Sequence, residues 1–118
     1  MTAREIVNHA VNLLGYSTAN GNTQIIPRIM NRAVSIVNTV YEDLWGITSE
    51  QEFEPIKALN DEVKLTGRAL GIMPYGVAAF IAQSESDGDS QQLWMLTYNK
   101  KRRGLSQAYT RVDTMPRI

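Results

Sequence analysis

The segment "IIPRIMNRAVSIVNTVYEDLWG" at residues 25–46 decides the fold. Its apolar residues recur three and four positions apart, which is the period of one face of an α-helix and not the alternation of a β-strand. We therefore expect a long helix that ends near Gly46, with a start blurred by Pro27, because proline removes a backbone donor. The residues on the apolar stripe are Ile26, Ile29, Met30, Ala33, Val37, Val40, Tyr41 and Leu44.

Three further apolar residues of this segment, Val34, Ile36 and Trp45, lie off the stripe. The helix is thus predicted to be apolar on more than one side. A chain of 118 residues suits a single domain with one hydrophobic core. The pattern therefore predicts a neighbour beyond that core.

The chain before this segment predicts a shorter helix. Thr2 and Glu5 have the spacing of a capping box, and an apolar stripe follows until Gly15. The stretch "STANGNT" at residues 17–23 is rich in turn-forming residues and is interpreted as a loop.

Two more helices are predicted in the second half of the chain. The stretch "IMPYGVAAFIAQSE" at residues 72–85 begins the third helix, with Pro74 in the first turn, where a missing N–H is harmless. Asp89 is predicted to cap the fourth helix, with Gln92 as its reciprocal partner and Gly104 at its end. The apolar run from Leu93 to Tyr98 nearly encircles this helix, which predicts neighbours on all sides.

Residues 47–66 and 105–118 lack a sustained period. The first stretch is interpreted as an irregular connector, compatible with one short hairpin, and the second as an extended tail. The predicted fold class is mainly α, a small single-domain helical bundle of about four helices with a long central helix. Residues 1–104 would form the helical domain and residues 105–118 the extended C-terminal tail.

Composition and motifs argue against several functions. Twelve basic and twelve acidic residues cancel, and the chain has no cysteine. His9, the only histidine, has no ligand at metal-binding spacing, and "DGD" at 87–89 fails as a calcium loop because Gln92 stands where glycine is required. We therefore expect no enzyme activity, no catalytic residue, no cofactor and no metal site. No apolar run has the length of a membrane span, so we also expect no membrane partner.

The charges are distributed unevenly along the neutral chain. Residues 42–62 contain seven acidic residues against Lys57, and residues 90–118 contain six basic residues against Asp113. The run Lys100, Lys101, Arg102 and Arg103 has two interpretations. It could only complement the dipole at the end of its helix, or it could form a contact, either with Glu50 and Glu52 of a neighbouring copy or with DNA in a channel.

Several stretches together resemble a known family. "RAVSIVNTVYEDLW" at 32–45, "FEPIKALNDEVKL" at 53–65 and "MPYGVAAFIAQSESDGDSQQLWMLTYNKKR" at 73–102 are similar to the head-tail connector proteins of tailed bacteriophages and prophages, also called adaptor or head-completion proteins. The particular similarities are Asn38, Tyr41 and Asp43, the run from Pro74 to Ala78, the acidic turn at Asp87 and Asp89, and Tyr98-Asn99 before the basic run.

This resemblance implies a structural virion protein. Its copies would form a ring under the portal after DNA packaging, extend the DNA channel and provide a platform for a tail or stopper protein. It would lie at the head-tail interface of the virion, and in the host cytoplasm during assembly, with double-stranded DNA passing through without sequence specificity. The tail would dock on the portal through Tyr109, Arg111, Val112, Met115 and Pro116.

The alternative is a small helical nucleic-acid-binding or regulatory module that grips phosphate with its basic C-terminal end. Such domains usually carry a strongly basic balance, and this chain has none. The connector interpretation is therefore preferred.

Overall fold

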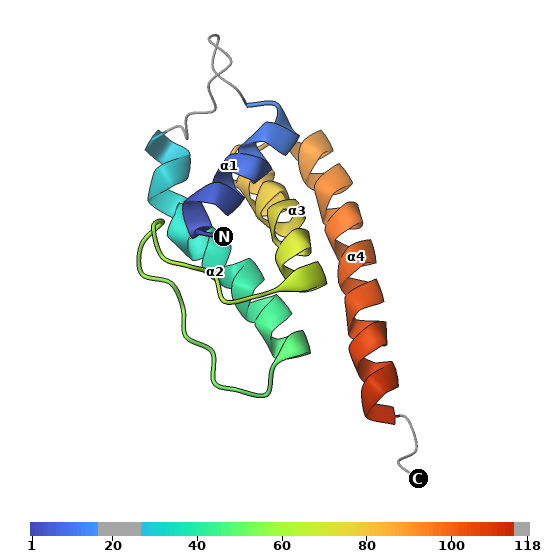
Figure 1. Ribbon diagram of the computed structural model, residues 1–118. Helices are drawn as coiled ribbons and strands as arrows, with labels where there is room; N and C mark the ends of the chain where they lie inside the picture. The colour runs from blue at the N-terminus through green and yellow to red at the C-terminus, as the bar shows by residue number, and fades with distance from the viewer. Residues whose placement is uncertain (17–26, 115–118) are drawn as a thin grey trace.

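The computed structural model describes residues 1–16 and 27–114, with the backbone alone for residues 110–114. Over these ranges the chain forms four helices packed as a bundle (Figure 1): α1 (Ala3–Leu14), α2 (Pro27–Thr48), α3 (Gly67–Ser84) and α4 (Gly88–Thr114). The predicted mainly α fold is confirmed. The predicted loop at 17–23 lies outside the described residues.

The long helix α2 carries the predicted apolar stripe into the core. Pro27 is its first residue, where proline's fixed backbone angle suits a helix start, and the helix continues two residues past Gly46. Its buried side chains are Ile29, Ala33, Val37, Val40, Tyr41 and Leu44. Met30, which was predicted on the stripe, is instead 39% exposed, and Ile26 lies outside the described residues.

Helix α1 is capped as predicted and is also tied to the connector. The Glu5 amide donates to Thr2 Oγ1 at 3.2 Å and the Thr2 amide donates to Glu5 Oε1 at 3.1 Å, which completes the capping box. Residues 49–66 form the predicted irregular connector, and the only strand-like pairing among the described residues is a single bridge between Thr2 and Glu62. The described part of the connector thus contains no hairpin.

Helix α3 is the most buried helix. Ten of its 18 residues are buried, and it packs against α1, α2 and α4. The predicted start near residue 72 is wrong, because the helix begins at Gly67 and Pro74 lies inside it. Pro74 removes one internal hydrogen bond, but the helix continues through it because both flanks are packed in the core.

The start and end of α4 both differ from the prediction. Asp87, not Asp89, caps the helix, since its Oδ1 accepts from the Ser90 amide at 3.3 Å. Gly104 does not end the helix, and the expected extended tail is wrong as far as Thr114. The reason is that Gly104 keeps a negative φ and Leu105, 2% exposed, is buried in the core, which holds the next turns in the helix.

Candidate functional site

The described residues form a groove between the first half of α3 and the middle of α4. It has a volume of about 650 Å³. One lining residue on each helix is a glycine, which has no side chain to fill the groove. The groove is lined by Arg68, Gly71, Ile72, Tyr75, Thr97, Lys100, Lys101 and Gly104, and we call it the basic groove.

The three cations of the basic groove have no acidic partner among the described residues. Arg68, Lys100 and Lys101 are exposed, and none of them takes part in an ion pair with another described residue. The Lys101 ammonium lies 4.9 Å from the centroid of the Tyr75 ring, a cation–π contact that holds it at the groove. The groove therefore presents positive charge that is partly fixed in place.

Arg102 is oriented differently from its two lysine neighbours. Its Nε and Nη2 donate to Asp43 of α2 at 2.6 and 2.8 Å, and the Tyr98 hydroxyl donates to the same carboxylate at 2.5 Å. Burial works to raise the pKa of Asp43, but the hydrogen bonds from Arg102 and Tyr98 outweigh it and leave the pKa below its ordinary value. Arg102 thus joins α4 to α2 within one chain.

Arg103, the last cation of the run, is exposed and forms no ion pair with the described residues. The predicted four-cation surface is therefore divided. Lys100 and Lys101 line the groove, Arg102 is paired internally, and Arg103 faces solvent.

The acidic residues singled out from the sequence lie in the connector. Glu50 and Glu52 are both exposed, and neither has an ion pair or hydrogen bond within the described chain. The backbone between them is fixed, because the Trp45 indole N–H donates to the Gln51 carbonyl at 2.9 Å. The connector begins at the end of α2 (Figure 1), and within the described chain neither acid forms an ion pair with the basic run of α4.

The outer face of α4 carries exposed leucines. Leu93 is 56% and Leu96 is 64% exposed, three residues apart on the same face. Trp94 and Met95 are half-buried and Tyr98 is buried, so the predicted encirclement of α4 by neighbours holds on one side only within the monomer. Tyr109, farther along the helix, is 42% exposed.

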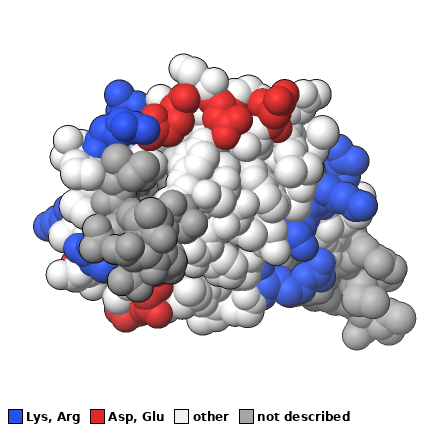
Figure 2. All heavy atoms as spheres, turned by 90° about the horizontal axis from the view of Figure 1, so that it is seen from above, with Lys and Arg blue, Asp and Glu red and all other residues white. Residues whose placement is uncertain are grey.

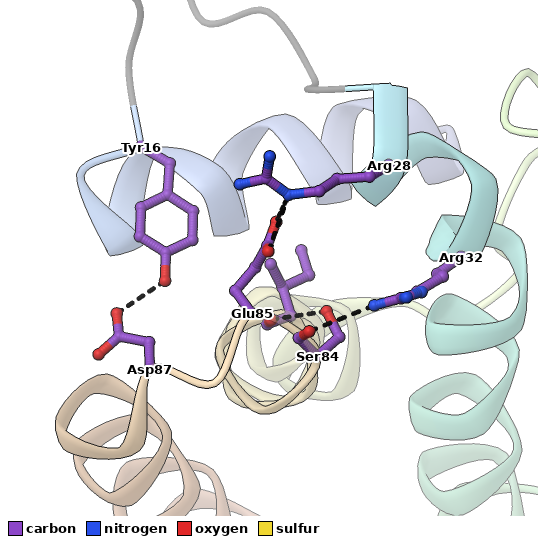
Figure 3. Close-up of polar contacts among 7 residues, drawn as sticks. Tyr16, Arg28, Arg32, Ser84, Glu85 and Asp87 are labelled. Atoms are coloured by element: carbon purple, nitrogen blue, oxygen red, sulfur yellow. Dashed lines mark hydrogen bonds and ion pairs between the residues drawn. The ribbon is translucent and has the colours of Figure 1, made fainter.

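A polar cluster in which charges are paired lies at the end of the bundle where the chain turns from α3 into α4 (Figure 3). The Tyr16 hydroxyl donates to Asp87 at 2.7 Å, Arg28 Nε donates to Glu85 at 2.7 Å, and Arg32 donates to the Ser84 carbonyl at 3.2 Å. These contacts fasten the end of α1 and the start of α2 to the turn between α3 and α4. We call this set the clasp.

The clasp shifts two pKa values. Burial, with the hydrogen bond to Asp87, raises the pKa of Tyr16 to about 12. The same hydrogen bond, with those from Ser90, lowers the pKa of Asp87.

Seen toward this end of the bundle, acidic side chains line one edge, and basic side chains lie at the edge where α4 runs (Figure 2).

Sequence reasoning missed Arg68 and Tyr75 as groove residues. Arg68 falls before the helix start predicted from Pro74, so no face could be assigned to it. Of the predicted docking residues, Tyr109 is exposed, Arg111 and Val112 lie on the helical backbone, and Met115 and Pro116 are outside the described residues.

His9 is exposed on α1, and the part of the chain that the structure describes contains no group of three or more His, Cys, Asp or Glu residues placed to bind a metal. Within the same residues, no helix combines the length and apolar character that crossing a membrane requires. Nothing among protein-family models, curated proteins or solved structures matches the chain.

Proposed function

We propose that this chain is a structural virion protein, a head-tail connector whose copies form a ring under the phage portal. The observation that carries the proposal is the outer face of α4, where Leu93 and Leu96 are more than half exposed. Adjacent exposed leucines on one helix face are typical of a surface that another subunit covers. A ring of such subunits would extend the DNA channel and offer a platform for a tail or stopper protein.

The portal contact is proposed for the C-terminal turns of α4. These turns extend past the ends of α2 and α3 (Figure 1), and Tyr109 is exposed on them. Because these turns are helical, docking would present Tyr109 from a helix whose backbone also includes Arg111 and Val112, whereas the other two predicted docking residues, Met115 and Pro116, lie outside the described residues. Helical presentation lowers the entropy lost on binding relative to an extended arm.

A mass measurement tests the proposal. The full-length chain is mixed with the portal protein of the same phage or prophage, and the mass of the complex is determined by native mass spectrometry. We expect several copies to join each portal ring, and the double variant Leu93→Gln/Leu96→Gln to lose most of this association while the monomer's melting temperature hardly changes. Met30→Gln, on α2 and 39% exposed, is the matched control. A wild-type chain that joins neither itself nor the portal would refute the connector function.

The basic groove supports the second candidate, a nucleic-acid-binding module. Its three unpaired cations could contact backbone phosphates. This candidate expects the monomer to bind duplex DNA with an affinity that falls steeply with salt. The connector proposal expects only weak binding of DNA by the monomer, because the chain has no net charge.

A further inference from the structure

We infer that the basic groove of one copy binds the Glu50–Glu52 segment of a second copy. The inference rests on the proposed function, because it names the contact that would join neighbouring subunits of the ring. The groove contact concerns a surface separate from Leu93 and Leu96. An experiment can therefore disprove the groove contact without disproving the contact through the leucines, and the reverse.

The groove is built to receive acidic side chains. Arg68 comes from α3 and Lys100 and Lys101 come from α4, so cations flank the hollow on both walls. The side chain of Arg68 extends across to α4, since a Cβ placed on Gly104 would lie 3.5 Å from its Nη2. Lys101 is held over Tyr75. Cations held in position lose less entropy when they bind a partner.

The remaining acids of the chain identify the occupant. Most described carboxylates are already used: Asp43 by Arg102, Glu54 by Lys64, Glu85 by Arg28, and Asp87 by Tyr16. Glu62 pairs with the N-terminal amine, Glu5 belongs to the capping box, and Asp61 accepts from the backbone of Lys57 and Ala58. Among the described residues, the exposed acids left over are Glu42, Glu50, Glu52 and Asp89, and of these only Glu50 and Glu52 are close to each other in sequence.

That pair is presented on a fixed turn. The Gln51 carbonyl accepts from the Trp45 indole, and the Gln51 amide donates to Ser49 Oγ at 3.1 Å. Two carboxylates are therefore held on either side of an anchored residue, and they match a groove that holds three cations.

The two surfaces are available for association between copies. Within the described chain, Glu50 and Glu52 form no ion pair with the groove cations, so both carboxylates are left to contact a second copy. A contact between two different surfaces is heterologous, and it produces a ring when the rotation closes. Phosphate of DNA is the rival occupant, but it would leave Glu50 and Glu52 without partners.

Two charge-reversed variants test the contact. The groove variant is Arg68→Glu/Lys100→Glu, and the connector variant is Glu50→Lys/Glu52→Lys. Each variant alone places like charges opposite each other, so we expect self-association, measured by sedimentation velocity, to weaken by at least about tenfold. When the two variants are mixed in equal amounts, each contact between one variant and the other joins opposite charges. We therefore expect association in the mixture to recover to within about threefold of wild type.

A second test uses an uncharged substitution and does not depend on reversing charges. A side chain at Gly71 meets no atom within 4 Å, so Gly71→Gln should fold normally and fill the groove. We expect it to weaken association at least about fivefold. Gly88→Gln is the matched control, because Gly88 is also exposed and unobstructed but is the first residue of α4 and does not line the groove.

The chain has no cysteine, so engineered thiols give a direct readout. Gln51→Cys and Gly71→Cys chains, mixed and treated with a short bismaleimide, should form a cross-linked heterodimer, whereas Gln51→Cys with Gly88→Cys should not. Rings that assemble normally despite both reversals and Gly71→Gln would overturn the inference and leave the connector function standing. Loss of duplex-DNA binding in the groove variant, without recovery of association in the mixture, would assign the groove to DNA. Absence of both self-association and the Gln51–Gly71 cross-link would overturn the inference, and the connector function would fail with it only if the wild-type chain also did not join the portal.

Discussion

The α3–α4 interface has a closed half and an open half, and a glycine marks each. At Gly76 the helices are so close that an added Cβ would lie 2.8 Å from the Tyr98 ring and 2.9 Å from Val40, whereas at Gly71 it would meet nothing within 4 Å. The charges differ in the same way. Arg102 is bonded to Asp43 beside the closed half, whereas Arg68, Lys100 and Lys101 around the open half form no ion pair with any described residue.

This difference separates the residues that hold the fold from those that are free to bind a partner. A glycine required by close packing and an arginine paired within the chain contribute to stability. A glycine in open space and cations without partners contribute little to it. Substitutions in the closed half should therefore lower stability, whereas substitutions in the open half should weaken association and change stability little.

The largest expected effect on stability comes from the two glycines. Gly76→Ala forces the buried Tyr98 ring and Val40 to move, and we expect the free energy of unfolding to fall by roughly 1–3 kcal/mol. Gly71→Ala should raise it by up to about 1 kcal/mol, because alanine favours the helix and meets no obstruction. Urea denaturation followed by circular dichroism measures both. Equal effects of the two substitutions would remove the distinction between the halves.

The adjacent cations of α4 provide the next comparison. Arg102→Gln breaks a two-point contact with a partly buried Asp43, and we expect a loss of roughly 1–2 kcal/mol, reduced from the value for a fully buried pair by solvent. Lys100→Gln should change stability by less than about 0.5 kcal/mol. Thermal melts of both variants test this. A Lys100 variant as unstable as the Arg102 variant would mean that the groove cations serve the fold.

The sequence was sufficient to predict the apolar face of α2 from Ile29 to Leu44 except at Met30, because such a stripe depends only on local period. It was insufficient where tertiary packing overrode a local signal. Pro74 suggested a helix start, but the core holds α3 through it, and Gly104 suggested an end, but burial of Leu105 carries α4 onward. The division between Lys101 and Arg102 could not be predicted, since it depends on Asp43, 59 residues away in the chain.

The dependence of stability on pH in the acid range tests the contacts of the paired carboxylates Asp43 and Asp87. The pKa of Asp43 is lowered in the folded chain, so its stabilising contribution is present above the ordinary carboxyl pKa and is lost as the pH falls through the folded value. Asp87 behaves likewise. We expect stability to decrease in this acid range and the decrease to become smaller in the variant Asp43→Asn. Lys100→Gln should leave the profile unchanged, because no paired carboxylate depends on it.

The smallest expected effect concerns the clasp at alkaline pH. The pKa of Tyr16 is raised from 10.0 to about 12, first by burial and then by the hydrogen bond to Asp87, so the folded chain favours the protonated phenol. The resulting stabilisation is fully present below pH 10.0 and is lost as the pH rises toward about 12, because the unfolded chain ionises first. Tyr16→Phe keeps the ring and removes the titrating group, so melting temperatures measured from pH 9 to 12 should fall less steeply in this variant than in wild type. Tyr109→Phe, at an exposed position on α4, is the control and should leave the profile unchanged. Identical profiles for wild type and Tyr16→Phe would show that the clasp does not hold the phenol in its protonated form, and the contrast between a bonded end and an open groove would then rest on the Arg28–Glu85 pair and the Arg32–Ser84 hydrogen bond.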